Sequence, residues 1–86
     1  MDREKIAERF KLMVAPITER QGFTLIKTEY VEEDGNNFLR AYIDKEGGIT
    51  IDDCVAVSRE ASKKLDKEDF IPEAYTMEIS SPGFME

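Results

Sequence analysis

The chain contains no histidine, no tryptophan and only one cysteine, Cys54. Without histidine it lacks the usual general base near neutral pH and the commonest metal ligand in proteins. A Ser–His or Cys–His nucleophile pair is equally impossible, and a single cysteine excludes an internal disulfide. We expect Cys54 to be a small buried side chain rather than a reactive thiol. These absences predict a protein that is not an enzyme and that uses no catalytic residues, no cofactor and no metal.

Long apolar runs are missing as well. No run approaches the roughly 20 residues that a membrane-spanning helix needs. The first five residues alternate in charge and do not resemble a signal peptide. We therefore expect a cytoplasmic protein with no membrane partner. The 86 residues suit a single domain, which can fold alone but with a thin margin of stability.

Basic residues are outnumbered, with 12 lysines and arginines against 19 aspartates and glutamates and a net charge of −7. Most of the excess lies between Glu29 and Asp53, where eight acidic residues accompany two basic ones. A negative field repels the phosphate backbone of nucleic acids and attracts basic partners. The alternative explanation is that these charges serve solubility alone.

The periodicity of the apolar residues predicts a first helix over residues 3–20. Its inner face should hold five apolar side chains, Ile6, Phe10, Met13, Val14 and Ile17. Gly22 is placed to end the helix in a left-handed cap.

Two strands follow, at residues 23–31 and 37–44, and form an antiparallel hairpin. The turn between them pivots on Asp34 and Gly35, a pair typical of tight hairpin turns. The inner face of the first strand is left open between two sets of side chains, Ile26 and Tyr30, or Phe23, Leu25 and Val31.

A second helix follows the break at Gly47 and Gly48, with Thr50 or Asp52 as its N-cap. Its inner stripe should hold four residues flanked by Cys54 and Ala61, namely Val55, Ser58, Ser62 and Leu65. Pro72 forbids continuation of the helix. In the third strand that follows, three side chains share one face, Tyr75, Met77 and Ile79.

The elements define an α+β fold in the order helix, strand, strand, helix, strand, with both helices packed on one face of a three-stranded sheet. A strand–helix–strand crossover is right-handed, and we expect the third strand beside the first, giving the spatial order 2-1-3. The other face of the sheet is then uncovered. Phe38 and Tyr42 lie on that face, where they could stack nucleic-acid bases or make a packing or protein contact.

An ordered set of motifs runs through the second half of the chain. Its most specific parts are the run Gly48-Ile49-Thr50-Ile51-Asp52-Asp53-Cys54 and the later run Ser80-Ser81-Pro82-Gly83. With these motifs the chain resembles the N-terminal domain of the RimP ribosome maturation factors. The resemblance extends over nearly the whole chain, from the first helix to Gly83.

The resemblance implies that residues 1–83 form this α/β domain. Ser81, Pro82 and Gly83 then belong to an inter-domain linker, and residues 84–86 mark its start or a truncation point. The family's C-terminal SH3-like barrel, an expected partner, is absent from this chain. The resemblance also implies a non-enzymatic, cytoplasmic factor for ribosome biogenesis. Such a factor binds the free small (30S) ribosomal subunit during assembly and is linked to the strongly basic ribosomal protein S12.

The candidate partner-binding residues come from two places. Four acidic residues follow the second strand and open the second helix, Asp44, Glu46, Asp52 and Asp53. Two aromatic residues, Phe38 and Tyr42, lie on the uncovered face of the sheet. We expect the acidic residues to dock on S12, with ribosomal RNA reached only indirectly. We favour them over the acids of the hairpin turn because they coincide with the family-like motif. The alternative is an RNA-contacting α/β domain that uses the open sheet face.

Overall fold

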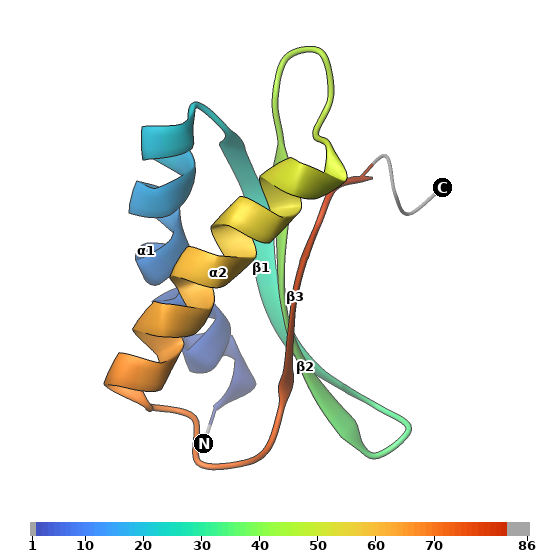
Figure 1. The fold of residues 1–86 in the computed structure, drawn as a ribbon. Coiled ribbons are helices and arrows are strands. Elements are labelled where there is room, and N and C mark those ends of the chain that lie inside the picture. Colours follow the sequence, from blue (N-terminus) through green and yellow to red (C-terminus); the bar gives the residue numbers. More distant parts are fainter. Residues whose placement is uncertain (1, 83–86) are drawn as a thin grey trace.

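Two helices lie on one face of a three-stranded sheet in the computed structural model, which describes residues 2–82 (Figure 1). The elements follow the chain as α1 (Arg3–Gln21), β1 (Thr24–Glu33), β2 (Asn36–Asp44), α2 (Ile51–Glu68) and β3 (Thr76–Ser80). The predicted α+β class and the order of its elements are therefore confirmed. No helix in the described part of the chain is long and apolar enough to cross a membrane.

Helix α1 begins and ends at the caps that its sequence provides. The side chain of Asp2 accepts a hydrogen bond from the backbone N–H of Glu4 at 2.9 Å. Gly22 adopts a left-handed conformation with a φ of 79° and donates its N–H to carbonyl groups of the last turn, as predicted. All five side chains predicted for the inner face are buried, Ile6, Phe10, Met13, Val14 and Ile17.

The β1–β2 hairpin turns on two residues with positive φ, Asp34 at 53° and Gly35 at 81°. Two such residues in succession make the tight turn whose twist matches that of the flanking strands. The predicted pivot is therefore confirmed, and it fixes the antiparallel register of β1 against β2.

A β-bulge at Ile26 explains why the inner face of β1 is ambiguous in sequence. Leu25 and Lys27 pair with successive residues of β2, so Ile26 has no partner and is 49% exposed. The extra residue shifts the alternation of side chains by one position. Phe23 and Leu25 therefore pack against the core on one side of the bulge, and Tyr30 is buried on the other. Each of the two alternatives is correct for only part of the strand.

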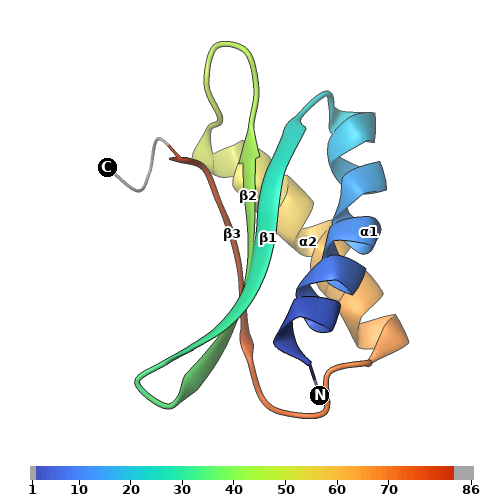
Figure 2. The ribbon, with the colours of Figure 1, turned by 180° about the vertical axis from the view of Figure 1, so that it is seen from behind.

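The strand order is β1-β2-β3, so the predicted order 2-1-3 is wrong. β3 pairs in parallel with β2 rather than lying beside β1 (Figures 1 and 2). The physical reason is burial, because a central strand is covered along more of its length than an edge strand. Leu39, Ala41 and Ile43 of β2 are fully buried, whereas Tyr30 is the only buried residue of β1.

Helix α2 is capped by Thr50, one of the two predicted candidates, and Asp53 rather than Asp52 completes the cap. The Asp53 N–H donates to the Thr50 side chain at 3.2 Å, and the Thr50 N–H donates to the Asp53 carboxylate at 3.0 Å. The predicted inner stripe is wrong at Val55, which is 42% exposed, and at Ser62, which is exposed.

The buried stripe of α2 begins one residue earlier than predicted and consists of Cys54, Val57, Ala61 and Leu65. Both stripes fit a helical period, so periodicity alone does not decide between them. Helix α2 contacts both α1 and β3, and the small side chains of Cys54 and Ala61 suit a helix held close to both. β3 follows with Tyr75, Met77 and Ile79 packed against the core, as predicted.

Candidate functional site

Four acidic residues lie between the last residue of β2 and the first turn of α2, and we call them the acidic loop: Asp44, Glu46, Asp52 and Asp53. They lie at one end of the sheet, whereas the hairpin turn lies at the other end (Figure 1). The structure therefore brings together the four acids that the sequence singles out. The two acid-rich segments cannot form one patch.

Two members of the acidic loop, Asp44 and Asp53, make hydrogen bonds or ion pairs within the domain. The Asp44 carboxylate accepts the backbone N–H of Lys45 at 2.9 Å. Asp53 caps α2 and pairs with the Lys45 ammonium at 2.8 Å, and this lysine, with the Thr50 N–H, lowers the pKa of the Asp53 carboxyl. Both carboxylates therefore stabilise the start of the helix and the loop before it.

The other two members, Glu46 and Asp52, are exposed. Within residues 2–82 neither makes an ion pair or a side-chain hydrogen bond. Their charge is therefore available to a partner without loss of an internal contact. At the hairpin turn Glu33 is held by Arg40, whereas Glu32 and Asp34 are exposed as well.

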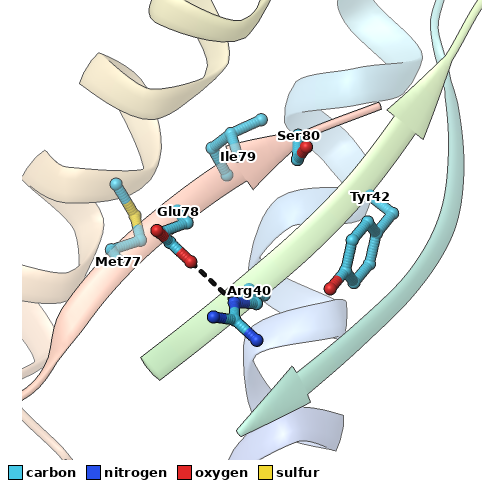
Figure 3. Close-up of a pocket in the computed structure, with 6 residues that line it drawn as sticks. All are labelled: Arg40, Tyr42, Met77, Glu78, Ile79 and Ser80. Carbon is cyan, nitrogen blue, oxygen red and sulfur yellow. Dashed lines mark hydrogen bonds and ion pairs between the residues drawn. The ribbon is translucent and has the colours of Figure 1, made fainter. Parts of the chain in front are cut away.

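Arg40 organises the face of the sheet that the helices leave uncovered (Figure 3). Its Nε donates to Glu78 at 2.6 Å, and its two terminal nitrogens donate to Glu33 at 3.0 and 2.9 Å. The Glu29 carboxylate lies 3.5 Å from the same guanidinium. The hydrogen bonds from Arg40 lower the pKa of Glu33. One cation is thus shared among three carboxylates, which leaves this face without an available positive charge at Arg40.

Phe38 and Tyr42 lie on this open face, as predicted, and both rings are covered by cations of the chain itself. The Arg40 guanidinium lies 4.7 Å from the Phe38 ring centroid, and the Lys27 ammonium lies 5.0 Å from that of Tyr42. Tyr42 is 4% exposed and donates its hydroxyl to Glu29 at 3.0 Å. Burial and this carboxylate raise the pKa of Tyr42. The arrangement disfavours base stacking, which needs an exposed ring face.

A depression of about 550 Å³ on the open face is lined by side chains from β2 and β3 (Figure 3). Its polar groups are the Arg40–Glu78 pair, the Tyr42 hydroxyl and Ser80. Arg40 and Glu78 already satisfy each other, and the tyrosine is committed to Glu29. Among residues 2–82 no group of three or more Asp, Glu or Cys residues is placed to hold a metal ion. Three of the polar side chains that line the depression, Arg40, Tyr42 and Glu78, are therefore engaged within the domain.

Sequence reasoning missed a second surface, between α2 and β3. Ile51 and Val55 are 72% and 42% exposed and line a groove of about 300 Å³ together with Cys54, Ser58 and Ile79. We call it the α2–β3 groove. The sequence signal was present, because Ile51 and Val55 are apolar and four residues apart. The prediction that Val55 belongs to the core conceals this signal.

Cys54 is 8% exposed and is one of the residues that line this groove. Burial, with the nearby Asp53 charge, raises the pKa of the thiol. Because the thiolate is the reactive form, we expect a thiol reagent to label the native protein at least roughly 100-fold more slowly than the protein in denaturant. Stopped-flow labelling with a chromogenic disulfide would measure both rates, and comparable rates would mean that Cys54 is accessible in the native state.

The predicted linker begins where β3 ends. Ser81 is buried and Pro82 is exposed, while Gly83 lies outside the described residues. β3 ends beside the start of α2, so the chain leaves the sheet at the same end of the domain as the acidic loop (Figures 1 and 2). The assignment of these three residues to a linker remains a prediction.

Comparison of the chain with models of known protein families assigns it to a family. A family model described as the RimP N-terminal domain matches residues 13–85 of the chain. The match begins within α1 and includes the hairpin, the acidic loop, α2 and β3. Since it spans most of the chain, the protein belongs to the RimP family of ribosome maturation factors and represents the N-terminal domain of that family.

Proposed function

We propose that this domain binds the free small (30S) ribosomal subunit during its assembly in the cytoplasm, and that it docks through the acidic loop on the basic ribosomal protein S12. Membership of a ribosome maturation family supports the process. The observation that carries the docking site is the pair of exposed acids, Glu46 and Asp52, which make no internal ion pair within residues 2–82. The role is one of binding and positioning rather than catalysis.

Exposed and unpaired carboxylates suit such a role for a physical reason. A lysine or arginine of the partner can approach them without breaking any contact that holds the domain together. Complementary charge of this kind raises the rate of encounter and selects the orientation of docking. The family's SH3-like C-terminal domain, joined through Ser81, Pro82 and Gly83, would lie close to the acidic loop and could share the same partner.

Direct binding of ribosomal RNA through the open sheet face is the alternative. It has less support, because Arg40 is neutralised by Glu33 and Glu78 and the ring of Tyr42 is buried. The net charge of −7 further weakens contacts with phosphates. RNA is then reached indirectly, through the protein partner.

Neutralising the free acids of the loop should weaken binding through the association rate. The double variant Glu46→Gln with Asp52→Asn raises the net charge by two, and we expect it to associate roughly tenfold more slowly with S12 or with free small subunits at low salt. The matched control is Glu8→Gln with Glu32→Gln, which makes the same change at two exposed acids elsewhere. Biolayer interferometry over a series of salt concentrations would measure both.

Two other results of this binding experiment would contradict docking through the acidic loop. Equal losses for the two pairs would indicate diffuse charge attraction with no docking site. Tight binding of naked ribosomal RNA that both pairs leave unchanged would favour the open sheet face. Circular dichroism and denaturation of each variant test whether the fold is intact. This control is needed because Asp52 lies in the first turn of α2, where a negative charge is favourable.

A further inference from the structure

The two edge strands of the sheet, β1 and β3, differ in the features that discourage pairing with another strand. β1, one edge, carries a bulge at Ile26 and exposed charged residues such as Lys27 and Glu32, which are devices that discourage pairing with another strand. β3, the other edge, pairs only with β2 and has neither a bulge nor a lysine. Its one charged side chain, Glu78, is held by Arg40 on the open face. β3 is therefore the edge that remains open to pairing.

The outer side of β3 adjoins the exposed apolar residues of α2. The α2–β3 groove is lined by Ile51 and Val55 from the helix and by Ile79 from the strand. Ile51, at 72%, is the most exposed of the large apolar side chains in the described chain. An open strand edge beside an apolar groove is the combination used in recognition by strand addition. There the main chain supplies the hydrogen bonds, and alternate side chains fill the groove.

The charge around the α2–β3 groove indicates which kind of partner it binds. Asp52 follows Ile51 directly, and Glu46 lies in the loop before it, so the end of the groove at Ile51 is acidic. A second copy of this chain would bring another −7 of net charge, which opposes pairing of two β3 edges. A partner segment with basic residues meets no such opposition.

We propose that the edge of β3 and the α2–β3 groove bind an extended, basic segment of a partner protein as a fourth strand of the sheet. In an extended segment, alternate side chains point to opposite faces. One set, which is apolar, enters the groove, and lysines or arginines at the end of the segment near Ile51 lie beside Asp52 and Glu46. The proposal rests on the proposed function for the basic character of the partner, and it adds a mode of binding that charge alone does not provide.

The test uses the 86-residue chain labelled with ¹⁵N and two synthetic octapeptides. One alternates lysine with valine, and the other alternates lysine with serine. We expect the lysine–valine peptide to shift the amide signals of Thr76–Ser80 and of the first two turns of α2, and the lysine–serine peptide to leave these signals in place. Changing Ile51→Gln with Val55→Gln should weaken binding by about tenfold, because truncated apolar anchors dominate such interfaces.

The matched control is Leu12→Gln with Ile26→Gln, which removes two apolar side chains that are 69% and 49% exposed elsewhere on the surface. It should bind the peptide as the unchanged chain does. Equal weakening in both variants, shifts confined to β1 or the open face, or equal effects of the two peptides would overturn the proposal. Shifts of β3 that grow with protein concentration alone would assign the edge to a second copy and would also overturn it. Since no ribosomal component is present, this test can fail while the acidic loop still docks, and the reverse is equally possible.

Discussion

Replacing Phe10 by alanine is expected to destabilise the domain by about 3–5 kcal/mol, the range for an aromatic side chain removed from a close-packed core. Phe10 is 0% exposed and lies at the centre of the inner face of α1. Its removal leaves a cavity that the surrounding elements cannot fill without moving. For a domain of this size such a loss is a large share of the total stability. Chemical denaturation followed by circular dichroism measures it.

Leu12→Ala provides the control on the same helix, because Leu12 is 69% exposed. Its cost should stay within about 0.5 kcal/mol, as for most surface substitutions. A loss below about 1 kcal/mol for Phe10→Ala, or similar losses for the two variants, would contradict the assignment of the inner face.

Arg40→Met should destabilise the domain by about 2 kcal/mol at neutral pH, the magnitude typical of hydrogen bonds to charged groups, with some loss to solvent screening. The Arg40 side chain is 20% exposed and is the cation shared by Glu29, Glu33 and Glu78. Without it the three carboxylates repel one another across the open face. Denaturation curves for both proteins give the difference in unfolding free energy.

The difference in unfolding free energy between the original protein and Arg40→Met should depend on pH, and the titration of Glu33 determines the direction of that dependence. Its pKa in the folded domain is lowered from 4.5 by the hydrogen bonds from Arg40. Its contribution is therefore fully present above the unfolded pKa and is lost as the pH falls through the folded pKa. The gap between the original protein and Arg40→Met should be widest near neutral pH and should narrow below about pH 4.5. A gap that does not change with pH would mean that Arg40 acts by packing alone.

Arg40→Lys separates charge from geometry. Lysine keeps the positive charge but cannot hold Glu33 and Glu78 in the fixed fork that a guanidinium provides. The stability of the Arg40→Lys variant should lie between that of the original protein and that of Arg40→Met. A lysine variant as stable as the original would show that a point charge is sufficient on this face.

The helices and the hairpin could be predicted because their signals are local. The spacing from Ile6 to Ile17 defines one face of α1, and Asp34 with Gly35 suits only a tight turn. The order of the strands could not be predicted in the same way. It depends on which strand is covered along most of its length, which is a property of the assembled sheet. The structure shows that property as a greater number of buried positions in β2 than in β1.

The sequence groups the acids of the loop together, whereas the contacts of each one come from the structure. The spacing from Thr50 is the signal that separates Asp53 from the exposed Asp52 beside it, because a threonine followed three residues later by an acid is the pattern of a capping box. The ion pair of Asp53 with Lys45 follows only from the folded loop. The difference arises from side-chain directions at a helix start. Tyr42 was correctly placed on the open face, but its burial depends on Lys27 and Glu29 of the neighbouring strand. Contacts across strands follow from the register, which the turn at Asp34 and Gly35 sets for the part of β1 that holds Lys27 and Glu29.

β1 can lose a residue at one place without changing which side chains face the helices. Because Ile26 alone lacks a partner on β2, a chain without it would pair regularly and keep both halves of the strand as they are. A deletion between Thr28 and Val31 would instead absorb the bulge by turning Lys27 toward the core. Relatives that differ by one residue in this strand should therefore differ at the bulge, and an alignment gap belongs there rather than in the hairpin turn.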